Sequence, residues 1–243
     1  VKTASDFSAF KPLVEDIQNA PNGDASGETI CSGAANYASL LAYRDNGVTP
    51  SQFVTCASAC GKGGSTSGGL IKSSAWYISK FLPHLNAAKN LNADTAIHAV
   101  LWAQGESDAS ALQTYQTYYD RLNQLQIDTE SDAKLKTGQT SPVFFITYSL
   151  STRIAYTDAI ARAQFDLCKN NPKFVMATPT YFIPRTPEGT HMYAAGYKWL
   201  GAFYGRAYKQ LLIDKIKPFW LEPLSVVQNA AVVDIKFGVP QQP

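Results

Sequence analysis

The segment His98-Ala-Val-Leu-Trp-Ala-Gln-Gly-Glu-Ser-Asp-Ala109 joins a mostly apolar run to a polar loop. The run, 95–102, is typical of a strand covered on both faces in a parallel sheet. It stops at Gln104-Gly105-Glu106. Because open parallel sheets bind ligands at the carboxyl ends of their strands, an amide, a glycine and a carboxylate at this place indicate a functional loop.

The rest of the chain repeats the same alternation of strand, loop and helix. Further apolar runs predict strands over 52–58, 142–148 and 173–178. Between and around them, helical spacing or composition predicts helices near 35–45, 73–90, 115–125, 155–170 and 197–211. The polar stretch 129–140 predicts a surface loop. This order predicts an α/β fold, a three-layer α/β/α sandwich around a parallel sheet.

Composition bounds the functions that the chain can have. The 243 residues suffice for one large domain, predicted over 1–217, and 45% of them are hydrophobic. The net charge is only +2 and no basic run occurs, which argues against nucleic acid and anionic membrane surfaces as partners. No apolar run approaches the roughly 20 residues of a membrane helix, and the first residues do not resemble a signal peptide.

The end of the chain differs from the rest. Two β-type runs, 224–227 and 231–237, flank Gln228-Asn229-Ala230 and predict a β-hairpin. The segment 218–243 is therefore either a hairpin at the edge of the sandwich or the beginning of a β-domain.

Four cysteines occur, at Cys31, Cys56, Cys60 and Cys168. Cys56 and Cys60 are four apart, but no histidine lies nearby to complete a zinc site. We expect ordinary thiols, with one disulfide left open for a secreted protein.

Two of the loops after strands carry groups suited to stabilising an oxyanion. The glycine-rich stretch 59–69 does not match a phosphate-binding loop. Its glycines can present backbone N–H groups to an oxyanion, or the stretch is a flexible connector. Gln104 can donate its side-chain amide to the same oxyanion, or bond to local backbone. For Glu106 we expect a role in holding its loop together.

His191 is the best candidate for a catalytic base. It follows a proline-rich loop at the predicted start of the last helix, and Glu188 stands three residues before it. A histidine oriented by a carboxylate is what activation of a nucleophile needs. The alternative is an exposed capping histidine. His84 and His98 are predicted to be structural.

Together these motifs resemble the SGNH (GDSL-like) hydrolases, most of all the sialate O-acetylesterase-type carbohydrate esterases, which include esterase domains of bacteriophage tail spikes. The stretches that carry the resemblance are Gly27-Glu28-Thr29, Gly61-Lys-Gly-Gly-Ser-Thr-Ser67, Trp102-Ala-Gln-Gly-Glu-Ser107, Glu188-Gly-Thr-His191 and Gly196-Tyr197. The similarity spans nearly the whole chain. The final motif has Glu188 where the family normally has Asp.

The resemblance implies a carbohydrate O-acetylesterase with a Ser-His-Glu type site. His191 and Glu188 would be catalytic, Gly64 and Gln104 would form the oxyanion hole, and Gly63, Gly105 and Glu106 would support the site. The substrate would be an O-acetylated carbohydrate, with no metal and no organic cofactor. A virion tail or extracellular location, and a homo-oligomer such as a trimer, are also implied.

One element of the family pattern is not found. The nucleophilic serine normally follows the first strand in a Gly-Gln-Ser or Gly-Asp-Ser motif, which this sequence lacks, and only four strands are predicted where the family has five. We expect both to reside in a separate N-terminal segment that completes the sheet. Internal candidates are Ser65, Ser67 and Ser32. Rival hypotheses are a non-catalytic carbohydrate-binding or virion-structural module, and one polypeptide of a two-chain esterase.

Overall fold

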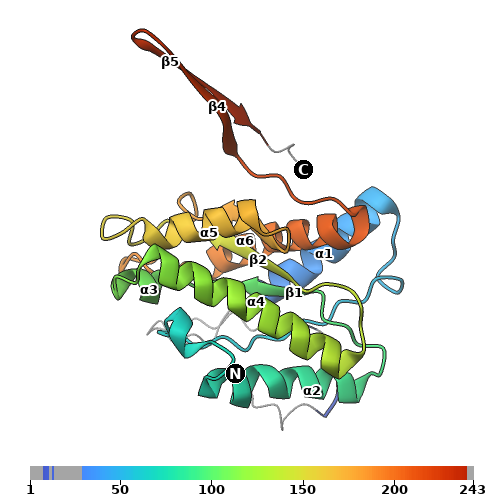
Figure 1. Cartoon of the computed structure of the whole chain (residues 1–243). Coiled ribbons are helices and arrows are strands. Elements are labelled where there is room, and N and C mark those ends of the chain that lie inside the picture. Colours follow the sequence, from blue (N-terminus) through green and yellow to red (C-terminus); the bar gives the residue numbers. More distant parts are fainter. Residues whose placement is uncertain (1–7, 11–12, 14–28, 240–243) are drawn as a thin grey trace.

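The computed structural model describes residues 8–10, 13 and 29–239. In that part of the chain three strands form one parallel sheet in the order β1-β2-β3 (Figure 1): β1 Ala99–Trp102, β2 Phe144–Ser149 and β3 Phe174–Pro179. Phe145 lies opposite both Val100 and Phe174, and Phe145 and Phe174 are fully buried. The sheet is thus covered on both faces, as the continuous apolar runs predicted.

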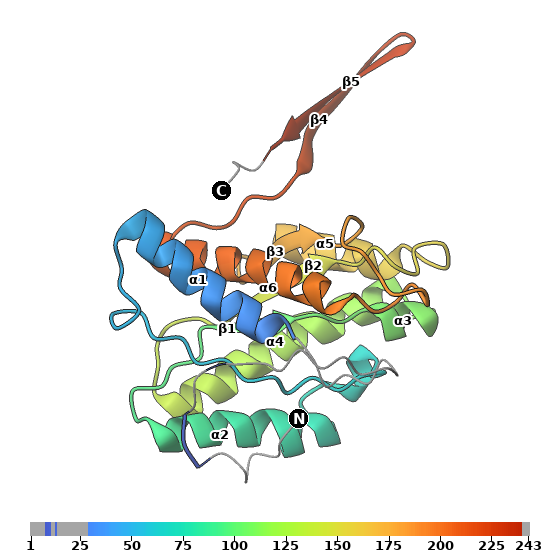
Figure 2. The same ribbon diagram turned by 180° about the vertical axis from the view of Figure 1, so that it is seen from behind.

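Helices cover both faces of the sheet. They are α1 Ile30–Asn46, α2 Leu82–Leu91, α3 Glu106–Ser110, α4 Tyr115–Thr137, α5 Ala159–Asn170 and α6 Ala194–Lys209, with short 3₁₀ or π-helical stretches at Ser67–Gly69, Tyr77–Phe81 and Gln210–Asp214. Figure 1 shows α4 and α5 in front of the sheet, and Figure 2, from behind, shows α1 and α6 in front of it. The predicted α/β sandwich is confirmed. Among the described residues, no helix has both the length and the apolar character needed to cross a membrane.

Helices α1 and α6 pack unusually closely through small residues. A Cβ atom at Gly201 would lie 2.7 Å from the Ile30 carbonyl oxygen, and one at Gly33 would lie 2.7 Å from the Lys198 carbonyl oxygen. Any side chain at these positions would push the helices apart. This contact fixes α6, whose N-terminus adjoins the loop that carries His191.

The strand predicted over 52–58 does not form. Its side chains alternate between half-buried and exposed from Phe53 to Ser58, and Val54 is 81% exposed. The backbone is therefore extended, but no strand in the described part of the chain pairs with it. An apolar run becomes a strand only where a neighbour offers hydrogen-bonding partners, and sequence pattern alone does not reveal that neighbour.

The surface loop predicted over 129–140 is also wrong up to Thr137, because α4 continues to that residue and ends at Gly138 in the left-handed conformation. The polar Glu130 faces inward there. Its carboxylate accepts hydrogen bonds from Lys134, at 2.7 Å, and from the backbone N–H of Val143, at 3.2 Å. These hydrogen-bond partners, which the fold places next to Glu130, make burial of this polar turn favourable.

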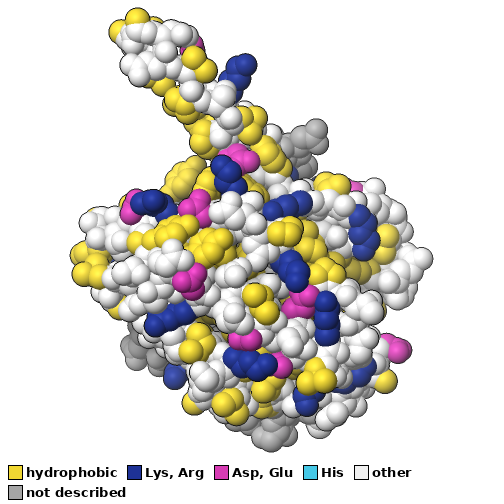
Figure 3. All heavy atoms as spheres, in the orientation of Figure 1, with side chains coloured by type: hydrophobic (Ala, Val, Ile, Leu, Met, Phe, Trp, Pro, Cys, Tyr) yellow, Lys and Arg dark blue, Asp and Glu magenta, His cyan; other side chains and the backbone are white. Residues whose placement is uncertain are grey.

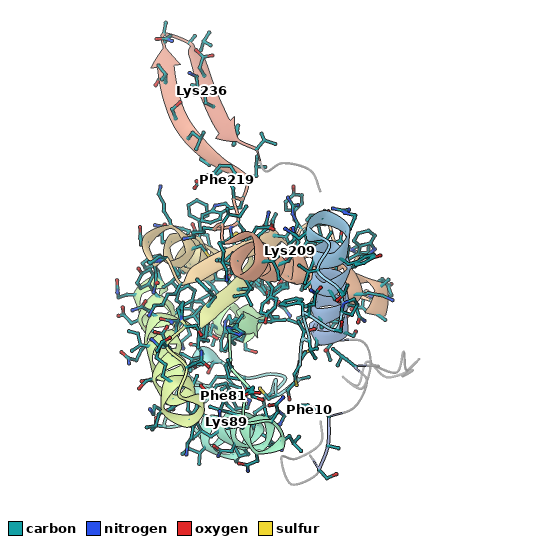
Figure 4. The ribbon with its side chains drawn as sticks, turned by 90° about the vertical axis from the view of Figure 1, so that its right-hand side faces the viewer. Phe10, Phe81, Lys89, Lys209, Phe219 and Lys236 are labelled. Carbon is teal, nitrogen blue, oxygen red and sulfur yellow. The ribbon has the colours of Figure 1, made fainter. Side chains whose placement is uncertain are left out.

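The predicted C-terminal hairpin is confirmed as β4 Glu222–Asn229 paired antiparallel with β5 Val232–Gly238. It projects away from the sandwich (Figures 1 and 2). In Figure 4, Phe219 lies at its base and Lys236 far out along it. Of the residues discussed above, Gly27 and Glu28 lie outside the described part of the chain.

Candidate active site

The loop between β3 and α6 is closed into a tight turn that carries Glu188 and His191. The Thr186 N–H donates to the His191 carbonyl at 2.9 Å, and the Gly189 N–H donates to the Thr186 carbonyl at 2.8 Å. Gly189 has φ +77°, a left-handed conformation that favours glycine. The turn places residues 188 and 191 side by side without any help from a distant element.

The Glu188 carboxylate holds the His191 ring. Glu188 Oε1 lies 2.6 Å from His191 Nδ1 and accepts from the His191 backbone N–H at 3.2 Å. Hydrogen bonds from the Thr186 hydroxyl and then from His191 hold the pKa of Glu188 at about 2, so it is ionised at neutral pH. An ionised acceptor at Nδ1 assigns the ring proton to that nitrogen and leaves Nε2 as a base. The His191 side chain is 64% exposed, which makes Nε2 accessible.

Gln104 ties its loop to the glycine-rich loop. Its amide nitrogen donates to the Ser65 carbonyl at 3.0 Å and to Asp108 Oδ2 at 2.5 Å, and its amide oxygen accepts from the Tyr118 hydroxyl at 3.2 Å. Both amide hydrogens are therefore already in use. A direct oxyanion contact by Gln104 requires one of these bonds to be released.

Asp108 is the functional-loop residue that sequence reasoning missed. It is fully buried and accepts from the Ser67 N–H and the Ser67 hydroxyl, each at 2.7 Å. Because Asp108 also accepts a hydrogen bond from Gln104, its carboxylate joins the glycine-rich loop to the loop that follows β1. The only signal in the sequence was the carboxylate itself, two residues after Glu106.

Gly105 and Glu106 have supporting positions. Gly105 is buried at φ +151°, where a Cβ would lie 3.1 Å from Ile160, so the turn out of β1 is packed tightly against α5. Glu106 accepts a hydrogen bond of 2.7 Å from the buried Tyr148 hydroxyl, which anchors the start of α3 to β2. These contacts agree with a structural role for both residues.

Gly63 and Gly64 lie exposed in the glycine-rich loop, with Gly64 at φ +69°. Within the described residues, neither backbone N–H donates to a backbone carbonyl or to a side chain. These N–H groups are therefore free to bind an anion at the protein surface.

Tyr197 lies in the first turn of α6 and is half-buried. Burial raises the pKa of its hydroxyl, a contact with the Met192 backbone opposes this, and the charges of Glu106 and Glu188 raise it further. Because β1, β2 and β3 are parallel, the loops that follow β1 and β3 leave the sheet at the same edge.

The three candidate serines have different surroundings. Ser67 is buried and its hydroxyl is committed to Asp108, Ser65 contributes its carbonyl to the Gln104 contact, and Ser32 is buried in the first turn of α1. Neither Ser65 nor Ser67 forms a hydrogen bond with His191 in the described part of the chain.

A serine–histidine contact that sequence reasoning missed joins Ser58 to His84, with 2.5 Å between Oγ and Nδ1. His84 is buried and burial lowers its pKa, so the ring is neutral at pH 7. Ser58 and His84 lie in a different part of the molecule from Glu188 and His191, between 52–58 and α2.

None of the four cysteines, all of which lie in the described part of the chain, forms a disulfide. Burial raises the pKa of the Cys60 thiol to about 11 and raises those of Cys56 and Cys168 as well. Because the thiolate is the reactive form, these three are poor nucleophiles at neutral pH.

The chain resembles known proteins at the level of family and fold. The model of a family described as carbohydrate esterase, sialic acid-specific acetylesterase, matches residues 9–210. Among solved structures, a crystal structure of a protein from Arabidopsis thaliana is similar over 61% of this chain and 58% of its own, with 21% identity and a TM-score of 0.52. This likeness concerns the fold. No curated protein matches the chain. Since the family model covers most of the chain, the protein belongs to this family of carbohydrate esterases.

Proposed function

We propose that the protein removes acetyl groups from O-acetylated carbohydrate by a serine-esterase mechanism in which His191 is the general base. The observation that carries this proposal is the 2.6 Å contact between Glu188 Oε1 and His191 Nδ1, with Nε2 exposed on the other side of the ring. An oriented imidazole with an accessible ring nitrogen is what a hydroxyl nucleophile requires.

In the proposed reaction, His191 Nε2 takes the proton of a serine hydroxyl while Oγ bonds to the acetyl carbonyl carbon. The free N–H groups of Gly63 and Gly64 offer donors for the resulting oxyanion. The carbon–oxygen bond to the sugar then breaks, and His191 gives its proton to the sugar oxygen. Water attacks the acetyl-enzyme, again through His191, to release acetate and restore the serine. Glu188 keeps the ring in the required tautomer throughout.

For the nucleophile we propose a serine on an additional strand that lies between β1 and the extended segment 52–58. Phe53 packs against Tyr208 of α6, with ring centroids 6.2 Å apart, whereas Ser58 bonds to His84 of α2. Figure 4 shows Lys209 on the α6 side of the molecule and Lys89 of α2 on the other. The segment thus runs between the two helical layers, where a strand of the sheet would lie. β1 has one unpaired edge in the described structure.

Acetate release tests the catalytic proposal. Purified protein is incubated with an O-acetylated glycan and with an aryl acetate, and acetate is measured. His191→Ala should lower kcat by several orders of magnitude, as expected for one member of an activated serine–histidine unit. His98→Asn, which alters a half-buried histidine outside the loop, is the matched control. Equal rates in the wild type and His191→Ala would remove His191 from the mechanism.

A serine-directed phosphonate identifies the nucleophile. After labelling, intact mass and peptide mapping show which polypeptide carries the adduct. We expect the label on a serine outside residues 1–243, in a segment that stays bound to the sheet. Adducts on Ser65, Ser67 or Ser32 in a fully active chain would refute this part of the proposal, and an adduct on Ser58 would assign catalysis to the Ser58–His84 pair. Absence of any adduct or acetate release, with glycan binding retained, would favour the non-catalytic binding module.

A further inference from the structure

Four aromatic side chains form a row that leads from the proposed catalytic loop onto α6. The row begins at Tyr181, which follows β3 and is 73% exposed, and continues through Phe182 to Phe203 of α6. The ring centres of Tyr181 and Phe182, and those of Phe182 and Phe203, are each 5.6 Å apart. Trp199, 65% exposed, lies one helical turn before Phe203, and residues four apart are neighbours on a helix surface. We call these four residues the aromatic row.

The rings of the aromatic row are held in place by one another. Both ring contacts are edge-to-face, with interplanar angles of 83° and 73°, an arrangement that aromatic pairs prefer. Phe182 and Phe203 are less exposed than the two ends and support them, whereas the rings of Tyr181 and Trp199 stay largely open to solvent. Rings fixed in this way lose little conformational freedom when a ligand stacks on them.

The aromatic row begins at a cavity of about 460 Å³ between the segments that follow β2 and β3. Tyr181 lines this cavity from one segment and Tyr156 from the other. Glu188, which orients His191, is part of the same wall. The volume falls within the range of roughly 300–1,000 Å³ that is usual for small-molecule sites and suffices for one sugar residue. The wall also contains Arg153 and Arg185.

We propose that the aromatic row is a track for the sugar residues next to the acetylated one, so that the substrate is a polysaccharide or long oligosaccharide and not a free monosaccharide. This inference rests on the proposed esterase function. One face of many sugar rings carries mainly C–H groups, which pack against aromatic rings while the hydroxyls at the rim stay in water. Tyr181 and Trp199 are the two stacking surfaces of the track.

The position of the aromatic row favours a sugar chain as its occupant. The row is continuous with the cavity that contains Glu188, and the group that leaves in the proposed reaction is a sugar oxygen. A chain whose acetylated residue reaches His191 would lay its next residues along the wall from Tyr181 toward α6, which Figure 2 shows at the front of the molecule. A protein partner or a lipid surface has no such link to the catalytic loop.

The first test varies the length of the substrate. Mono-, di-, tetra- and hexasaccharides of β-linked glucose and of α-linked N-acetylneuraminic acid are chemically O-acetylated, and acetate release is measured with each. In at least one series kcat/KM should rise about tenfold or more from the monosaccharide to the hexasaccharide. The gain should come from a lower KM, because the track adds binding away from the reacting bond. Efficiencies that do not rise with length in either series would overturn the proposal.

Variants then assign the dependence on length to residues. Trp199→Ala and Tyr181→Ala should each lower the hexasaccharide-to-monosaccharide ratio of kcat/KM toward one, whereas Trp199→Phe and Tyr181→Phe keep a ring and should retain most of it. Tyr43→Ala, which removes an exposed tyrosine from the last turn of α1, is the matched control and should leave the ratio unchanged. An unchanged ratio in both alanine variants, or an equal loss with long and short substrates, would contradict the track.

Binding without hydrolysis separates this inference from the proposed function. Calorimetry with the unacetylated oligosaccharides should show affinities that increase with length and fall in Trp199→Ala. If this pattern is found but acetate is never released, the track stands and the esterase function fails. If acetate release depends on His191 but not on length, the esterase function stands and the track fails. Binding to vesicles of phosphatidylcholine and phosphatidylserine that depends on Trp199, without binding of oligosaccharides, would identify a membrane-contacting surface and overturn the proposal.

Discussion

Asp108 accepts two hydrogen bonds of 2.7 Å from Ser67, one from its backbone N–H and one from its hydroxyl. The two residues are 41 positions apart, and both are buried. Because the same carboxylate also accepts from Gln104, it fixes the glycine-rich loop against the loop that follows β1. The proposed oxyanion donors therefore depend on a buried carboxylate that need not touch the substrate.

Asp108→Asn should destabilise the protein by about 2–4 kcal/mol, because donors that now meet a carboxylate are left poorly paired in the interior. Ser67→Ala, which removes the hydroxyl and leaves the carboxylate, should cost about 1–2 kcal/mol. Urea unfolding followed by circular dichroism measures both. Asp120→Asn, in an exposed carboxylate of α4 that accepts from Gln116, is the control and should change stability by less than about 0.5 kcal/mol. A loss at Asp108 no larger than the control would show that the two loops are held in another way.

Glu188→Gln should lower kcat for acetyl ester hydrolysis about 100-fold, less than His191→Ala, because it removes the charge that orients the imidazole but keeps its shape. The pKa of Glu188 is about 2, well below its usual value, so its charge is present at neutral pH and is lost only as the pH falls toward 2. The loss should therefore be the same at every pH from about 5 to 8. Glu188→Asp should retain more activity than Glu188→Gln. A loss that fades between pH 7 and 5 would mean that Glu188 titrates in that range.

The free energy of unfolding should depend on pH in the acidic range because of Glu130. Burial alone would raise the pKa of Glu130, but hydrogen bonds from Lys134, Lys173 and the Val143 N–H outweigh it and hold the pKa at about 2. Since the folded pKa is depressed, the stabilisation is present above the unfolded value of about 4.3 and is lost as the pH falls from there toward 2.

Glu130→Gln should accordingly cost about 2–3 kcal/mol at pH 7 and much less at pH 3. The measurement is a series of urea unfolding curves between these pH values. Asp158→Asn is the control, because Asp158 meets Arg162 at 3.7 Å in an exposed pair that contributes little. If the difference between the wild type and Glu130→Gln does not shrink toward low pH, the carboxylate is not the source of the effect.

The strands that the sequence predicted correctly are those whose burial shows as a continuous pattern of apolar residues along the chain. The runs that became β2 and β3 are buried on both faces, so their apolar character is continuous and easily recognised. The segment 52–58 has the same character but no partner in the described structure, and pairing is not a property of the segment itself. The turn of α4 around Glu130 was missed for a related reason, because Lys173, one of the partners that make its burial favourable, comes from a distant part of the chain.

The contacts of the candidate site can also be divided into those that local sequence predicts and those that it does not. Glu188 and His191 are three residues apart, so a local turn brings them together and their spacing predicted the contact. Ser67 and Asp108 meet only because β1 carries one loop to the other. Arg153 and Arg185 share one cavity wall although they follow different strands, and neither belongs to a motif. Contacts between loops depend on the sheet that positions them, which a pattern along the chain does not contain.

The last prediction concerns the hairpin. Val226, Val233 and Ile235 share one of its faces and are 61%, 53% and 48% exposed. Figure 3 shows hydrophobic side chains along this projecting arm. A two-stranded hairpin is marginally stable alone in water, and unpaired strand edges bind other strands.

We therefore expect the hairpin to drive self-association of the chain. Sedimentation velocity should show concentration-dependent oligomers for the full chain and monomers after removal of residues 222–243. The melting temperature of the sandwich should change by only about 2 °C or less, because the hairpin supplies no buried residue of the main core. The double variant Val226→Lys and Ile235→Lys keeps the hairpin but places charges on its apolar face, and it should also be monomeric. A full chain that stays monomeric from about 1 to 100 µM, or a double variant that associates like the wild type, would contradict self-association through this face.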